Sequence, residues 1–309
     1  MNDATALRAS GIQFSYGKTA VLRGIDLEVA AGEIFGLVGP DGAGKTTLIR
    51  VFCGLLPPES GSCRVLGFDT VKDRARLIRK IGYLSQRFSL YSDLSVGENL
   101  DFFAEIHGLK GYAVRKERLL EDMDLRRFQK RLAGDLSGGM KQKLALACTL
   151  IHTPEILFLD EPTNGVDPVA RRDFWDILAG ISAGGVTIVI STPYLDEAEH
   201  CRRVAFMNAG RAIAIETPAG AKERIRGRVC EIVCDPVARA RAVACLAPGV
   251  ISVQVFGDKI HAELEAGANP SALRAAVEKV ARVSSFRIIR PSLEDVFIRL
   301  LTGMQETPA

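Results

Sequence analysis

The sequence predicts an α/β protein: a large domain built on a parallel β-sheet, followed by a small α+β domain. An apolar strand at 34–38 runs directly into a glycine-rich loop and then a helix that begins at Gly44. Further apolar strands alternate with helical stretches, as in parallel sheets covered by helices, and are expected at 81–84, 156–159 and 186–190. Beyond Pro218 the pattern changes to strand, helix, strand, strand, helix, strand.

The elements of the large domain follow in chain order. Short β-rich runs at 7–14 and 25–29 open the chain. A stretch from about Ser95 to Leu132 has helical periodicity with charged faces and predicts a helical insertion. Two later helices are expected, one beginning near Ser137 and one spanning 168–181.

The small domain is expected to contain strands at 229–233, 250–256, 259–264 and 284–289, and helices at 237–246, 270–281 and 293–301. This βαββαβ order predicts a ferredoxin-like fold. We therefore expect two domains, 1–226 and 227–309, with a helical subdomain at about 87–140.

Composition excludes several classes of partner and location. The 309 residues carry 40 basic and 37 acidic side chains, so no strong field directs the chain to nucleic acid. The N-terminus lacks the pattern of a signal peptide, and no stretch approaches the roughly 18 apolar residues of a membrane span. We expect a cytoplasmic chain that does not itself cross a bilayer.

The seven cysteines show no paired CxxC spacing and lie mostly in apolar runs. Buried free thiols are the favoured interpretation. The alternative is a metal site built on Cys230 and Cys234.

A phosphate-binding loop follows the 34–38 strand and matches G-x-x-x-x-G-K-[ST]. Its glycines let backbone N–H groups surround phosphate oxygens at a helix N-terminus. Lys45 would contact the β- and γ-phosphates, and the Thr46 hydroxyl would bind Mg²⁺. The expected nucleotide-binding residues here are Gly39, Pro40, Asp41, Gly42, Ala43, Gly44, Lys45, Thr46 and Thr47. The alternative, a glycine-rich turn with a stray lysine, is weak because the pattern arises by chance in about one such chain in a hundred. The motif predicts a P-loop NTPase without choosing its class.

Two carboxylates follow the strand at 156–159. Strands of a parallel sheet present functional residues at their carboxyl ends. Asp160 would hold Mg²⁺, and Glu161, which points differently, would act as general base toward the attacking water. An isolated Asp-Glu pair would more often be two solvated acids, but the phosphate loop upstream favours the catalytic interpretation.

The segment Leu136-Ser137-Gly138-Gly139 begins a long helix and offers an N-cap hydroxyl with unobstructed backbone donors. Between a phosphate loop and an Asp-Glu strand, it resembles the signature of the ABC ATPases. The resemblance covers the chain from Tyr16 to about Thr217.

This resemblance implies further roles. Tyr16 matches the aromatic residue that stacks on adenine, and Gln86 matches a catalytic glutamine that touches the metal and leads to the helical subdomain. The segment 164–167 resembles the loop that contacts the opposing subunit, with Val166 where leucine is usual. The family implies an antiparallel N-terminal sheet, bound ATP and Mg²⁺, and a head-to-tail homo- or heterodimer in which Ser137, Gly138 and Gly139 complete the partner's ATP site.

The segments 191–199 and 291–297 resemble those of ABC-2 type export ATPases, particularly the first half of two-ATPase multidrug exporters. This implies ATP hydrolysis coupled to efflux of a drug or similar small molecule or lipid through a separate transmembrane permease. The chain would then lie peripherally on the inner face of the plasma membrane.

Pro193 departs from the family pattern, which has a histidine there that contacts the γ-phosphate. Proline offers neither a side-chain hydrogen bond nor an N–H, so it cannot replace that contact. His200, about 10 Å further along a helix, is not expected to replace it. Either this ATPase tolerates the loss, or the chain is the slow, ATP-holding regulatory half of a heterodimer.

Two other interpretations are less favoured. A soluble ABC protein acting on ribosomes or DNA would usually carry two cassettes or long coiled-coil insertions. The basic cluster Arg126, Arg127, Lys130 and Arg131 is interpreted as a solvated face rather than a docking surface for the permease or a nucleic-acid patch.

Overall fold

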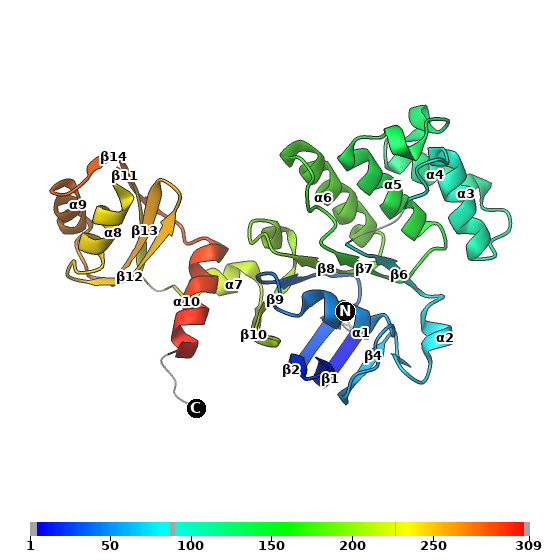
Figure 1. Cartoon of the computed structure of the whole chain (residues 1–309), viewed down its shortest axis with the longest axis horizontal. Coiled ribbons are helices and arrows are strands. Elements are labelled where there is room, and N and C mark those ends of the chain that lie inside the picture. The colour runs from blue at the N-terminus through cyan, green and yellow to red at the C-terminus, as the bar shows by residue number, and fades with distance from the viewer. Residues whose placement is uncertain (1–4, 87–89, 226, 306–309) are drawn as a thin grey trace. The chain divides into compact units, whose positions relative to one another are not determined.

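The computed structural model describes residues 5–86, 90–225 and 227–305, and the chain forms two compact units, Met1–Ile215 and Glu216–Ala309 (Figure 1). The division falls before the expected domain boundary at Arg226, which lies outside the described residues. Residues 87–89, at the start of the expected helical subdomain, also lie outside them. No helix in the described ranges combines the length and apolar character needed to span a membrane.

A six-stranded sheet in the order β10-β9-β3-β8-β7-β6 forms the centre of the first unit. Four of its strands match the predicted ones, namely β3 (Ile34–Val38), β6 (Ile81–Leu84), β7 (Ile156–Asp160) and β8 (Thr187–Thr192). Neighbouring strands from β9 to β6 run parallel, and β3, β7 and β8 are buried throughout, which explains their continuous apolar sequences. The remaining strands, β9 (Arg203–Asn208) and β10 (Arg211–Glu216), were not predicted.

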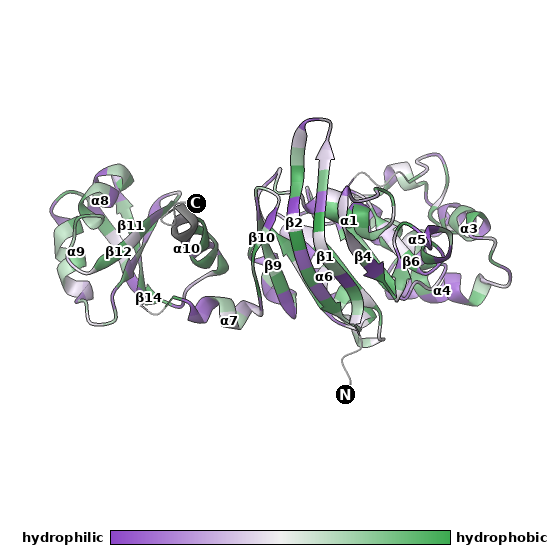
Figure 2. Ribbon diagram, turned by 90° about the horizontal axis from the view of Figure 1, so that it is seen from below, coloured by the Kyte–Doolittle hydropathy of each residue, from purple (hydrophilic) through white to green (hydrophobic). Residues whose placement is uncertain are grey.

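A second sheet in the order β2-β1-β4-β5 is antiparallel, as the resemblance implied. It contains β1 (Thr5–Tyr16), β2 (Thr19–Ala30), β4 (Ser60–Val65) and β5 (Phe68–Asp69), of which β4 and β5 were not predicted. Buried and exposed residues largely alternate along β2, and Figure 2 shows the corresponding change between hydrophobic and hydrophilic residues.

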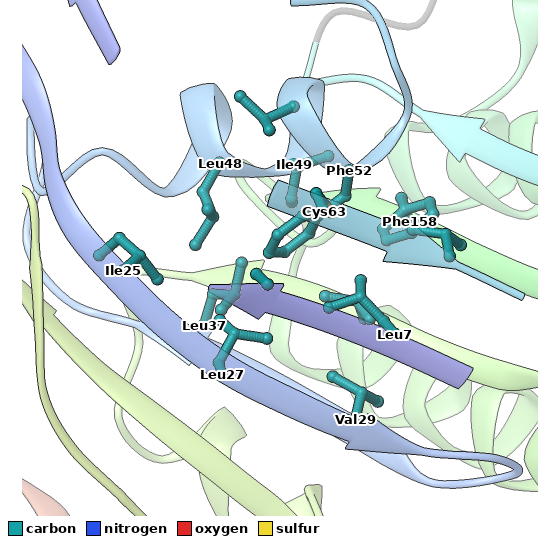
Figure 3. Close-up of a cluster of buried hydrophobic side chains, with 14 of the residues drawn as sticks. Leu7, Ile25, Leu27, Val29, Leu37, Leu48, Ile49, Phe52, Cys63 and Phe158 are labelled. Atoms are coloured by element: carbon teal, nitrogen blue, oxygen red, sulfur yellow. The ribbon is translucent and has the colours of Figure 1, made fainter. Parts of the chain in front are cut away.

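The main core of the first unit lies between this sheet and α1 (Lys45–Phe52). Leu48, Ile49 and Phe52 of the helix point toward Leu7 and Leu27 of the N-terminal sheet (Figure 3). The Phe52 ring also lies 6.0 Å from that of Phe158 on β7. Burial of this helical face anchors the phosphate loop that precedes it.

Helices α5 (Gly138–Leu150) and α6 (Pro168–Ala183) lie on the opposite side of the central sheet from α1 (Figure 1). The predicted helical stretch contains α3 (Val96–Ile106) and α4 (Ala113–Asp122), and the short α2 (Arg74–Leu77) precedes it. Helix α3 begins with a capping box between Ser95 and Glu98.

Two of the four residues in the basic cluster before α5 form local ion pairs. Arg126 pairs with Glu117 and Glu121, and Arg127 pairs with Asp124, all through exposed side chains. Such exposed pairs contribute little to stability and reduce the positive charge of the cluster, which supports the interpretation as a solvated face.

The second unit follows the predicted βαββαβ order after a short helix, α7 (Pro218–Glu223), that was not predicted. Its elements are β11 (Arg228–Asp235), α8 (Val237–Ala244), β12 (Val250–Phe256), β13 (Lys259–Leu264), α9 (Pro270–Glu278), β14 (Arg282–Ile289) and α10 (Leu293–Gln305). The sheet is antiparallel in the order β12-β13-β11-β14, so the two central strands come from the two halves of the unit. This is the ferredoxin-like arrangement.

Six of the seven cysteines are buried, whereas Cys245 is exposed, so the expectation of burial is wrong for that residue. Cys245 is the C-terminal cap of the short helix α8, and it and the following Leu246 are exposed. Cys230 and Cys234 pack inside the apolar core of the second unit. Burial raises the pKa of the Cys63 thiol to about 12, which suits an inert core side chain.

A buried histidine connects α10 to the sheet of the second unit. His261 Nδ1 lies 2.8 Å from Asp295 Oδ1, and its Nε2 lies 3.4 Å from Glu231 Oε2. Burial lowers the pKa of His261, but the hydrogen bonds to Asp295 and Glu231 outweigh it, so the net pKa is raised. Burial raises the pKa of Asp295, but its bonds to His261 and Ser292 lower it overall.

This pair predicts pH-dependent stability. The contribution of His261 is fully present below about pH 6.5 and is lost as the pH rises through its raised pKa, while that of Asp295 is lost as the pH falls below about 4. We expect Asp295→Asn to lower the melting temperature by a few degrees more at pH 5.5 than at pH 8.5. The exposed Asp258→Asn serves as the control. An equal loss at both pH values would contradict the assignment.

Candidate functional site

Four adjacent strands of the central sheet deliver their functional residues to one edge. The parallel strands β3, β8, β7 and β6 all end there, so the phosphate loop, Thr192, Asp160 and Gln86 emerge side by side. The pairing aligns Asp160 with Ser191 and Val38 with Thr192. The carboxyl edge of a parallel sheet is where ligands bind in this class of fold.

The phosphate loop curves around a cavity of about 340 Å³. A Cβ on Gly39 would lie 2.1 Å from the Met207 carbonyl oxygen, and Gly44, the N-cap of α1, has φ +98°, so both positions require glycine. The cavity is lined by Val21, Asp41, Gly42, Ala43, Gly44, Lys45, Thr46, Thr47, Gln86 and Glu161. Val21 is the member that the sequence did not single out.

Lys45 is buried at the base of this cavity, with 3% of its side chain exposed. Its Nζ donates to the carbonyl oxygens of Gly39 (2.8 Å) and Pro40 (3.1 Å) and lies 3.3 Å from Glu161 Oε1. The ammonium therefore lies where the loop and the proposed general base meet. A buried cation there can bind an anionic ligand strongly, because little water screens it.

Both carboxylate oxygens of Glu161 have a side-chain partner, and the backbone of this residue is strained. Its second oxygen, Oε2, accepts a hydrogen bond from Gln86 Nε2 (2.9 Å). Its φ of +50° is unusual for a non-glycine residue, and its N–H donates to the carbonyl oxygen (3.1 Å) and hydroxyl (3.0 Å) of Ser191. Such strain is typical of functional positions, and here it aims the carboxylate toward Lys45.

Asp160 and Thr46 form the candidate magnesium site. The Thr46 hydroxyl donates to Asp160 Oδ1 (3.0 Å), and the Ser191 hydroxyl donates to the same oxygen (2.7 Å). Asp160 Oδ2 is buried and has no hydrogen-bond partner in the described part of the chain. A buried carboxylate oxygen beside a threonine hydroxyl is the hard donor set that Mg²⁺ prefers, so these residues fit the ion.

The signature residues lie at the N-terminus of α5 and do not line the phosphate cavity. The Ser137 hydroxyl caps the helix by accepting from the Met140 N–H (3.3 Å). A Cβ on Gly139 would lie 2.5 Å from that of Ala170, so this glycine allows α5 to approach α6, whereas Gly138 has open space around it. A role of this segment in the partner's site stays a prediction.

Tyr16 also lies outside the residues that line the cavity. Its side chain is 48% exposed at the end of β1, and its ring packs edge-on against Phe14, with centroids 4.9 Å apart. The Arg50 guanidinium donates to Tyr83 and Tyr16, and these contacts raise its pKa against the opposing effect of burial. The exposed ring is available for stacking, which stays a prediction.

In the segment 164–167, Asp167 caps α6 by accepting from the N–H groups of Val169 and Ala170. Pro193 lies in the turn after β8. The imidazole ring of His200 stacks on the Trp175 ring of α6, with ring centroids 4.9 Å apart, so the imidazole packs against α6.

Two residues of the site were not identified from the sequence. Ser191 connects β8 to both Asp160 and Glu161, and Glu197 is a buried carboxylate between the loops after β7 and β8. Both lie in the segment 191–199, whose resemblance to export ATPases was the one available signal. Ser191 lies 30 and 31 residues from Glu161 and Asp160, and Glu197 lies 34 residues from Thr163, separations that no local pattern reveals.

Comparisons with known proteins are consistent with the site described above. Residues 22–164 match the ABC transporter family, and residues 217–301 match the C-terminal domain of DrrA1-3-like ATP-binding proteins. The chain is 36% identical to the daunorubicin resistance ATP-binding protein DrrA3 of Streptomyces coeruleorubidus, over 96% of both chains.

It is also 40% identical to the probable multidrug ABC transporter ATP-binding protein YbhF of Escherichia coli K12, over all of this chain but only 54% of YbhF, about half its length. Among solved structures, the ATP-binding subunit of an ABC transporter matches with a TM-score of 0.65 and 29% identity, over 72% of this chain and 94% of the other. With a phosphate loop, an Asp-Glu strand end and a DrrA1-3-like C-terminal domain, the chain belongs to the ABC ATPase family of transporter ATP-binding proteins.

Proposed function

We propose that this chain hydrolyses ATP to power efflux of a drug or similar small molecule through a separate membrane permease. The observation that carries the proposal is the position of Glu161, whose two oxygens contact Lys45 and Gln86 beside the phosphate cavity. A carboxylate placed there can accept a proton from water that attacks a phosphate held by the loop.

In the proposed reaction, the loop N–H groups and Lys45 bind the β- and γ-phosphates. Water attacks the γ-phosphorus as Glu161 takes its proton. The bond to the β–γ bridging oxygen breaks, leaving ADP and inorganic phosphate. Thr46 and Asp160 would hold Mg²⁺, which neutralises phosphate charge when bound. Gln86, bonded to Glu161, orients the base and provides a connection toward the helical subdomain.

The partner subunits and the cargo are proposed from the family. We propose that two ATPase subunits pair head to tail, so that Ser137, Gly138 and Gly139 of one contact the ATP held by Lys45 of the other. The relatives named for multidrug transport and drug resistance support a drug-like cargo. The ABC-2 type permease, and a position of the chain on the inner face of the membrane, are proposed from the sequence resemblance. The proposed domains are 1–226 for ATP and 227–309 as an accessory domain.

Pro193 favours a second candidate, a regulatory half that holds ATP and hydrolyses it slowly. Glu161 is nevertheless held by Lys45, Gln86 and Ser191, and none of these contacts involves residue 193. We therefore expect the purified chain to release phosphate from Mg-ATP, and Pro193→His to leave the rate largely unchanged, because Glu161 is already oriented without a contact from residue 193.

Pro193→Ala is the matched control, because it removes the ring without adding an imidazole. Near-zero release by the wild-type chain, restored by Pro193→His but not by Pro193→Ala, would instead establish the regulatory role. A complete second ATPase subunit would then be required.

A further inference from the structure

A buried carboxylate bridges the two loops that flank the site. Glu197 begins a short 3₁₀ turn (Glu197–His200), and only 2% of its surface is exposed. Its Oε1 accepts from the Thr163 hydroxyl and its Oε2 from the Thr192 hydroxyl, both at 2.6 Å. Arg171 Nε of α6 lies 3.3 Å from Oε1.

Each hydroxyl belongs to a functional loop. Thr163 lies two residues after Glu161. Thr192 ends β8, and its hydroxyl also accepts from the Tyr194 N–H (3.0 Å), which closes the turn around Pro193. One carboxylate therefore connects the loop that carries the general base to the turn that holds Pro193.

The same contacts reach α6. The Arg171 guanidinium lies 4.5 Å from the centre of the Tyr194 ring while it pairs with Glu197. Helix α6 begins just after the segment 164–167, so the helix, the Pro193 turn and the loop after Glu161 meet at Glu197.

Burying a carboxylate is costly, and apolar residues of similar size often stabilise a protein as well or better. Its two short hydrogen bonds are directional, so they restrict where Thr163 and Thr192 can lie relative to each other. A contribution to geometry accounts for this carboxylate better than a contribution to stability alone.

We propose that Glu197 is a positioning residue for ATP hydrolysis. It holds the Glu161 loop against the Pro193 turn, a contact to which the proline ring can contribute no hydrogen bond. The inference rests on the proposed function. Displacing a reacting group by about 1 Å can cost about 100-fold in rate, so a loosened loop should reduce kcat.

The test compares Glu197→Gln and Thr163→Val with two controls. Thr163→Ser retains the hydroxyl, and Asp196→Asn removes an exposed neighbouring charge. We expect the first two variants to lower kcat for ATP by about tenfold or more and to leave ATP affinity within twofold. Thr163→Ser and Asp196→Asn should keep wild-type kcat.

Hydrogen exchange of residues 161–167 and 191–196 provides a readout that does not depend on turnover, and exchange should rise in Glu197→Gln. Wild-type kcat and exchange in folded Glu197→Gln would overturn the inference. So would parallel losses of kcat, ATP affinity and melting temperature, with Thr163→Ser as defective as Thr163→Val. If the wild-type chain binds no ATP and releases no phosphate, the proposed function fails, while the exchange data still decide whether Glu197 holds the two loops together.

Discussion

Replacing Glu161 with glutamine is expected to lower phosphate release from ATP by about 100-fold or more while ATP binding persists. Glutamine keeps the size of the side chain and can still bond to Gln86, but it cannot accept the proton of the attacking water. General-base catalysis contributes about 10²- to 10⁴-fold to a rate. Phosphate release and binding of a fluorescent ATP analogue, measured on the same preparation, would check both parts.

The matched control for this variant is Glu105→Gln, an equal change on the exposed part of α3. It should behave like the wild-type chain. Substantial release by Glu161→Gln would mean that another group takes the proton, and the assignment of Glu161 would be wrong.

Lys45→Ala is expected to have the second large effect, a loss of about 100-fold in ATP affinity. A hydrogen bond to a charged group is worth about 1.5–3 kcal/mol, so losing contacts to two phosphates reduces affinity by that order. The variant also removes the cation beside the buried Glu161, whose remaining side-chain contact is the bond from Gln86. Isothermal titration with Mg-ATP measures the affinity directly.

The exposed Lys80→Ala is the control here, because its ion pair with Glu155 is on the surface. A melting curve in the absence of nucleotide separates lost binding from lost folding. Unchanged ATP affinity in a folded Lys45→Ala protein would contradict the proposed phosphate site.

Much of the fold could be predicted because the relevant signals are local. The strands β3, β7 and β8 are short, continuous apolar runs, since both faces of the central sheet are covered. The strands β4, β5, β9 and β10 were missed. β4 is polar and mostly exposed, β5 has two residues, and β10 is only partly buried, so none has a strong apolar pattern. β9 is buried, but it follows a short turn directly after the segment 191–199.

The sequence alone determined the chemistry of the site, because the phosphate loop and the Asp-Glu strand end need particular residue types at fixed local spacing. The tertiary structure alone decided which groups surround them. Ser191 contacts Asp160 and Glu161, and Glu197 contacts Thr163, across 30 to 34 residues of chain, and these contacts follow from the pairing of β7 with β8. The contacts of Lys45 and Gln86 with the two oxygens of Glu161 likewise exist because parallel strands end at one edge, and long-range strand pairing is not encoded in any single segment.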